Sequence, residues 1–155
     1  MITHSLCDSY RLEREMGIHD FTTDTFMIAL YSDTAVLGPS TTQYTTSGEV
    51  IGTGYLAGGI EILVADGYPK ANAIAESGYR AGSVVQIDFE DPRFVLVTLS
   101  ARGALIYNAS KQNRAICVID FGAVRNPTAE DFVIQLPPPG VNTALLRSFP
   151  HALNV

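Results

Sequence analysis

A glycine-rich stretch is the first candidate for chemistry in this sequence. Residues 50–59 read Val-Ile-Gly-Thr-Gly-Tyr-Leu-Ala-Gly-Gly. A phosphate-binding loop of the form Gly-x-Gly-x-x-Gly closes a strand and opens a helix, so that amides at the helix N-terminus face the phosphate. Here the third glycine comes one position late, at Gly58, and residues 60–64 predict a strand. The glycines therefore indicate positive φ angles or close backbone packing, and we expect no nucleotide cofactor.

The other side chains with catalytic potential are scattered. The histidines show no His-x-x-x-His pair, and no Gly-x-Ser-x-Gly elbow is present. Two pairs of neighbouring carboxylates occur, Glu90-Asp91 and Glu130-Asp131. Neighbours on a strand point to opposite faces, so neither pair forms an acid/base couple. We therefore expect no enzyme, no catalytic residue and no metal site.

Two cysteines, Cys7 and Cys117, lie far apart without metal-ligand spacing. Cys117 falls in the apolar run Ala-Ile-Cys-Val-Ile, which favours a buried, inert thiol. Free thiols are the preferred interpretation, with a disulfide between the two as the alternative. Neither a signal peptide nor an apolar run of about 18 residues is recognisable, so we expect synthesis in the cytoplasm and no membrane partner.

The composition and net charge of the chain indicate which kinds of partner it can bind. The chain has 155 residues, of which 46% are hydrophobic and 17% charged, and its net charge is −6. This length and composition are typical of one folded domain. An acidic chain without a dense basic run is not suited to a phosphate backbone, so nucleic acid is not an expected partner.

The elements that must position these residues are mainly strands. Residues 6–17 predict a short N-terminal helix that ends at Gly17. Apolar runs and period-two alternation predict strands at 26–31, 60–64, 83–89, 94–99, 103–107, 115–121 and 132–136. The polar turn 108–113 predicts that strands 103–107 and 115–121 pair as a hairpin. In Ser83–Phe89, we expect Val85, Ile87 and Phe89 on a buried face and Gln86 and Asp88 on a wet one.

The remaining segments are predicted to be irregular. Val36–Gly48 is a polar, Thr-rich loop, and Asp66–Gly82 is a loop with at most one short helical turn at 71–76. The prolines at 137–139 interrupt any strand, and the apolar tail 141–155 either packs on its own domain or docks on a neighbour. The break slightly favours an arm that reaches out.

Together these elements predict a mainly β chain. The economical arrangement is an antiparallel β-sandwich of jelly-roll or Greek-key type, with a short N-terminal helix and an extended C-terminal arm. We place one domain at residues 1–140 and the arm at residues 141–155.

An ordered series of blocks resembles one family. The series covers about Gly17 to Gly140, and order and spacing carry the likeness more than any one block. Its members are 24–32 (Asp-Thr-Phe-Met-Ile-Ala-Leu-Tyr-Ser), 52–59 (Gly-Thr-Gly-Tyr-x-Ala-Gly-Gly), 104–108, 119–122 (Ile-Asp-Phe-Gly), 131–135 and Pro139-Gly140. This series is similar to the small β-rich structural proteins of tailed bacteriophages, labelled decoration (cement) or minor virion proteins. The chain departs from the pattern at Asp66–Gly82 and after Leu136.

The resemblance implies a function without chemistry. We expect a capsid decoration protein on the outside of the virion, which stabilises contacts between major capsid subunits and self-associates as a dimer or trimer. A tail or neck adaptor or tube-associated protein is the first alternative, and a carbohydrate-binding sandwich is the second. Candidate subunit contacts lie on the helix, the Thr-rich loop, the 66–82 segment and the arm: Tyr10, Tyr44, Tyr68, Leu145, Leu146 and Phe149.

Overall fold

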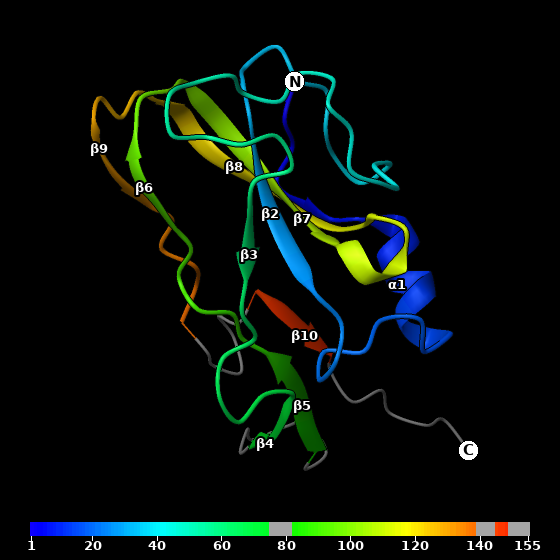
Figure 1. Ribbon diagram of the computed structural model, residues 1–155. Coiled ribbons are helices and arrows are strands. Elements are labelled where there is room, and N and C mark those ends of the chain that lie inside the picture. The colour runs from blue at the N-terminus through cyan, green and yellow to red at the C-terminus, as the bar shows by residue number, and fades with distance from the viewer. Residues whose placement is uncertain (75–81, 139–144, 149–155) are drawn as a thin grey trace. The chain divides into compact units, whose positions relative to one another are not determined.

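The computed structural model describes residues 1–74, 82–138 and 145–148. Within that part the fold is mainly β, with one α-helix, as the sequence predicts (Figure 1). The elements run β1 Ser5–Leu6, α1 Asp8–Glu15, β2 Phe26–Tyr31, β3 Ile60–Ile62, β4 Lys70–Ile74, β5 Gly82–Ile87, β6 Arg93–Val97, β7 Ala101–Asn108, the 3-10 turn η1 Ala109–Lys111, β8 Arg114–Arg125, β9 Glu130–Val133 and β10 Leu146–Ser148.

The chain divides into two compact units. Unit 1 holds Met1–Ile62 and Asp91–Ile134, and unit 2 holds Leu63–Glu90 and Gln135–Val155. The predicted boundary at residue 140, between a domain 1–140 and an arm 141–155, falls outside the described residues and stays a prediction.

Unit 1 is built on an antiparallel sheet in the order β1-β8-β7-β2-β3. Its centre is β7, where Ala104, Leu105 and Ile106 are all fully buried. Three consecutive buried residues require cover on both faces of the strand. Helix α1 contacts β8 (Figure 1), and the long β2–β3 loop folds back so that the Tyr44 ring stacks on Tyr107 at 4.9 Å.

Several local predictions for unit 1 are confirmed. Strand β2 spans the predicted residues 26–31, and β7 and β8 form the predicted hairpin. The hairpin closes through η1 and two residues with positive φ, Gln112 and Asn113. The predicted helix 6–17 is shorter, because Leu6 pairs with Cys117 as part of β1. Gly17, with φ +67°, marks its end as expected.

A second, two-stranded sheet in unit 1 pairs β6 with β9. Its register shifts between Phe94 and Val97, which is the mark of a β-bulge. Strand β6 ends at Val97 instead of the predicted residue 99, and β9 ends at Val133 instead of 136.

Unit 2 contains an antiparallel sheet in the order β10-β5-β4. The prediction of a loop with a helical turn at 71–76 is wrong for its described residues, because 70–74 form β4 and pair with β5 along its length. Alanine and asparagine are poor strand formers, and a partner strand overrides that local preference. Residues 75–81 lie outside the described part.

The face assignment in β5 is also partly wrong. Ile87 and Phe89 are buried as predicted, but Gln86 is buried and Val85 is exposed. Burial of the adjacent Gln86 and Ile87 means that both faces of the strand are covered there. The predicted alternation assumed that one face of the strand is exposed to solvent, so it could not predict burial on both faces.

Gly59 is the tightest point of the glycine-rich stretch. Its φ is +78°, and a Cβ added there would lie 1.8 Å from the Ile28 carbonyl oxygen. The residue therefore needs both the left-handed conformation and the missing side chain, because β2 and the end of the loop pass in backbone contact.

We expect Gly59→Ala to destabilise the protein by about 3 kcal/mol or more, since strain and a backbone clash add. Gly17→Ala is the matched control: its φ is +67° and no atom lies within 4 Å of the added Cβ. That substitution should cost about 1–2 kcal/mol. Urea unfolding of both variants checks the prediction, and equal losses would contradict it.

Candidate functional site

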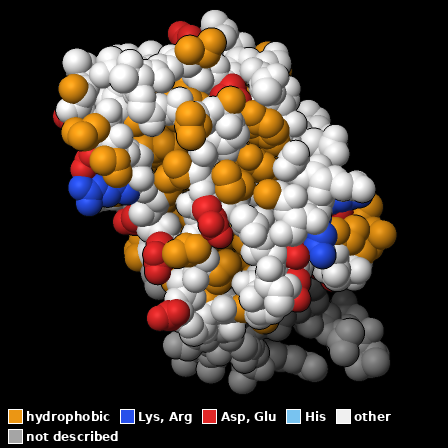
Figure 2. Space-filling view, viewed as in Figure 1, with side chains coloured by type: hydrophobic (Ala, Val, Ile, Leu, Met, Phe, Trp, Pro, Cys, Tyr) orange, Lys and Arg blue, Asp and Glu red, His pale blue; other side chains and the backbone are white. Residues whose placement is uncertain are grey.

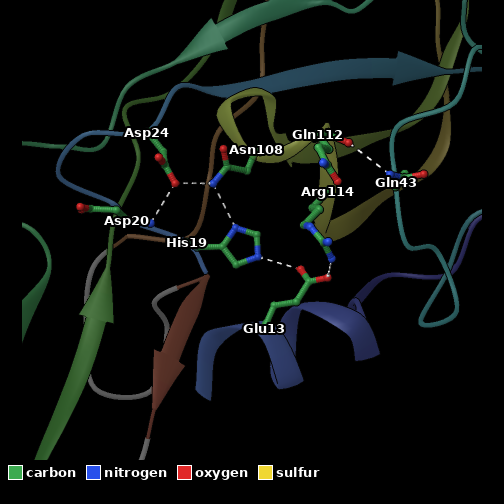
Figure 3. Close-up of polar contacts among 8 residues, drawn as sticks. All are labelled: Glu13, His19, Asp20, Asp24, Gln43, Asn108, Gln112 and Arg114. Carbon is green, nitrogen blue, oxygen red and sulfur yellow. Dashed lines mark hydrogen bonds and ion pairs between the residues drawn. The ribbon is translucent and has the colours of Figure 1, made fainter. Parts of the chain in front are cut away.

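A buried polar cluster, here called the His19 cluster, brings titratable side chains from several segments together (Figure 3). It joins α1, the segment before β2, and the adjoining ends of β7 and β8. Its members are Glu13, His19, Asp24, Asn108 and Arg114. The side chain of His19 is fully buried, and those of Glu13 and Asp24 are nearly so.

The hydrogen bonds assign the tautomer of His19. The Asn108 Nδ2 amide lies 2.8 Å from Asp24 Oδ2 and 3.0 Å from His19 Nδ1. Because that nitrogen has only hydrogens to offer, His19 Nδ1 must accept, and Nε2 then donates to Glu13 Oε2 at 2.9 Å. Both ring nitrogens are therefore engaged within the protein.

This arrangement resembles the orienting half of a catalytic triad but lacks its reactive half. A carboxylate holds one nitrogen of the imidazole, as in Ser-His-Asp sites, but an asparagine amide stands where the nucleophile would be. The ring is also closed to solvent. The geometry supports a structural clamp: Glu13 also accepts from Arg114, which joins α1 to β8.

Asp24 is the anchor of the cluster on the β2 side. Burial by itself would raise the pKa of this carboxyl, but donation from Asn108, from the Asp20 N–H and from Lys111 outweighs it and holds the pKa below its usual value. Asp24 therefore stays ionised and fixes the entrance to β2.

A second polar cluster, the Glu49 cluster, organises the β2–β3 loop. Glu49 Oε1 accepts from the Tyr55 hydroxyl and from the Gly58 N–H, each at 2.7 Å, and Oε2 accepts from the Tyr44 hydroxyl at 2.6 Å. Tyr55 in turn accepts from the Leu30 N–H of β2 at 2.9 Å. Burial and then hydrogen bonding to Glu49 raise the pKa of both tyrosines, so the phenols remain donors.

The Glu49 cluster gives the glycine-rich stretch its structural role. The Gly58 amide, which in a phosphate loop would face the ligand, is taken by a carboxylate of the same loop. The Gly58 carbonyl accepts from the Tyr107 hydroxyl at 2.9 Å, and strand β3 follows instead of a helix. The stretch is thus pinned to the sheet by its own side chains.

The two cysteines are both buried as free thiols. Burial, and then the nearby Asp8 charge, raise the pKa of Cys7 to about 12. Burial likewise raises the pKa of Cys117. Neither thiol therefore has the exposed, electropositive surroundings that produce a reactive thiolate.

The predicted contact residues fall in both units. Tyr10 is only 1% exposed and packs beside the His19 ring, while Tyr44 is half-buried in the Glu49 cluster. Tyr68 and Leu145 are half-buried in unit 2. Leu146 is buried in β10, and Phe149 lies outside the described residues.

Large aliphatic side chains that the sequence analysis did not single out are strongly exposed. Ile51 and Leu56 lie in the glycine-rich stretch, and Val95 and Leu96 lie at the bulge of β6. Apolar residues between glycines at 51–56 were a usable signal of exposure. No signal existed at 95–96, because the sequence reads as an ordinary strand there.

The substitution Asp24→Asn tests the His19 cluster through pH. The folded pKa of Asp24 is depressed, so its stabilisation is present above the unfolded value of about 3.9 and is lost as pH falls through the folded value. At pH 7 the variant should be less stable by about 1–3 kcal/mol. This gap should close below about pH 4.

Chemical unfolding of both proteins from pH 7 to pH 3 measures this difference, with the exposed Asp33→Asn as control. A gap that persists unchanged at pH 3 would show that the charge of Asp24 is not what stabilises the cluster.

Comparisons with known proteins identify no relative of this chain. Among the described residues, no helix is both long and apolar enough to cross a bilayer, and no three His, Cys, Asp or Glu side chains are grouped to hold a metal ion. A scan against protein-family models, a search of curated proteins and a search of solved structures each give no match to this chain.

Proposed function

We propose that this chain is a structural protein of a bacteriophage particle, a capsid decoration protein that binds the outside of the shell and stabilises contacts between major capsid subunits. One observation carries the proposal beyond the sequence resemblance. Within each of the two clusters, the polar side chains form hydrogen bonds with other groups of the same cluster. Several large aliphatic side chains of unit 1, in contrast, face solvent. Such a surface suits binding to another protein and not turnover of a substrate.

A decoration protein of this kind stabilises a shell through the number of copies that bind to it. Each copy adds a modest interface across the junction of two or more shell subunits, and many copies on one lattice resist the outward pressure of packaged DNA. Self-association as a dimer or trimer about a local symmetry axis belongs to the same proposal. So does the finer fold prediction, an antiparallel sandwich of jelly-roll or Greek-key type.

The carbohydrate-binding alternative is weakened by the tyrosines. A sugar site needs an exposed aromatic face and free polar groups beside it. Tyr44 stacks on Tyr107, and the hydroxyls of Tyr44 and Tyr55 are committed to Glu49. The loop aromatics of unit 1 are thus used internally.

Quantitative mass spectrometry of purified whole particles and of tail-free heads tests the proposal. We expect hundreds of copies per particle that remain with the heads. A few copies that follow the tail on fractionation would transfer the protein to the tail or neck. Complete absence from the particles would contradict a virion role.

A further inference from the structure

Four strongly exposed aliphatic side chains lie on adjoining segments of unit 1. Their exposed fractions are 98% for Ile51, 80% for Leu56, 58% for Val95 and 65% for Leu96. We call these four residues the aliphatic patch. Figure 2 shows hydrophobic side chains gathered on the face that holds β3 and β6, with acidic side chains among them.

Backbone contacts hold the two halves of the patch together. Thr53 and Thr98 exchange N–H···O bonds of 3.0 and 2.9 Å, so the glycine-rich stretch runs beside the end of β6. A Cβ added to Gly54 would lie 2.9 Å from the Leu96 carbonyl oxygen, and the Tyr55 and Phe94 rings lie 5.8 Å apart. The backbones at Gly54 and Leu96 lie so close that a larger residue does not fit at position 54.

The bulge of β6 is what turns two consecutive residues outward. Leu96 has a φ of +48°, a left-handed conformation that is strained for a residue with a side chain. Asp131 holds it there: one carboxylate oxygen accepts from the Leu96 N–H at 2.9 Å, and the other accepts from the Arg93 guanidinium. In a regular strand one of Val95 and Leu96 would point inward, so the strained backbone is what exposes both.

The segments that carry the patch have more acidic than basic side chains. Apart from Glu49, which is used inside its own cluster, segments 48–62, 91–99 and 127–134 contain four acidic side chains and one basic side chain, Arg93. Arg93 is itself paired with Asp131, while Glu61 and Glu130 are exposed. Two copies of this surface would repel each other, whereas a surface with lysine and arginine around an aliphatic centre would be attracted.

We propose that the aliphatic patch is a docking surface for a different protein, and that its occupant presents aliphatic side chains flanked by lysine and arginine. This inference rests on the proposed function, in which the occupant is the outer surface of the shell protein. The apolar centre supplies binding energy, and the acidic surroundings select the partner and speed its approach.

Binding to heads that lack the protein tests the inference. The variant Ile51→Ser/Leu96→Gly removes the two side chains, and glycine suits the positive φ at position 96. Val36→Ser is the control, because Val36 is also strongly exposed but lies outside the patch. Glu61→Gln/Glu130→Gln removes two exposed charges on β3 and β9, in the same segments as the patch. Thermal unfolding checks that each variant is folded.

We expect the double apolar variant to bind heads at least about tenfold more weakly than the unchanged protein, and Val36→Ser to bind within about twofold of it. Binding should weaken as salt rises, and less steeply for the charge variant. Equal binding of the apolar variant and the unchanged protein would overturn the patch and leave the capsid role standing.

Two further outcomes would also overturn the inference. If the unchanged protein does not bind heads at all, the proposed function fails together with the docking surface. If sedimentation shows that the protein self-associates and that Ile51→Ser/Leu96→Gly abolishes this, the occupant is a second copy and not a basic partner.

Discussion

Both oxygens of the Glu49 carboxylate accept hydrogen bonds from its own loop, and the position of that loop sets what unit 1 presents to solvent. Tyr44 and Gly58 are drawn to the same carboxylate, and Tyr55 links it to the Leu30 N–H of β2. Long loops are costly to order, so a segment of this length stays defined only when its polar groups are satisfied. Glu49 satisfies three of them at once, and Ile51 and Leu56 are held outward as a result.

The two polar clusters and the bulge share one design. In each, a carboxylate of the chain fixes a backbone that has no regular pairing: Asp24 fixes the entrance to β2, Glu49 the glycine-rich stretch and Asp131 the turn at Leu96. In the His19 cluster the ionisable side chains of Glu13, His19 and Asp24 are buried, and each has its partner inside the molecule. These carboxylates therefore set the local shape of the backbone in unit 1.

The sequence predicted those features that depend on local pattern. The run Phe26–Tyr31 and the hairpin closed by polar residues 109–113 are local signals, and both are confirmed. The strand β4 and the burial of Gln86 depend on partners elsewhere in the chain, and both were missed. The His19 cluster joins residues 89 positions apart, so no spacing rule reveals it. The bulge at Leu96 depends on Asp131, which lies 35 residues later, so local sequence does not reveal it either.

The most direct test of the account is hydrogen–deuterium exchange of the protein free and bound to heads. Backbone amides in a docking surface exchange more slowly when a partner excludes water. If the aliphatic patch is the docking surface, exchange slows on binding at residues 51–56 and 93–98 and does not change in α1 (Asp8–Glu15). Unchanged exchange at 51–56 and 93–98, with protection elsewhere in unit 1, would contradict it and move the interface to another face.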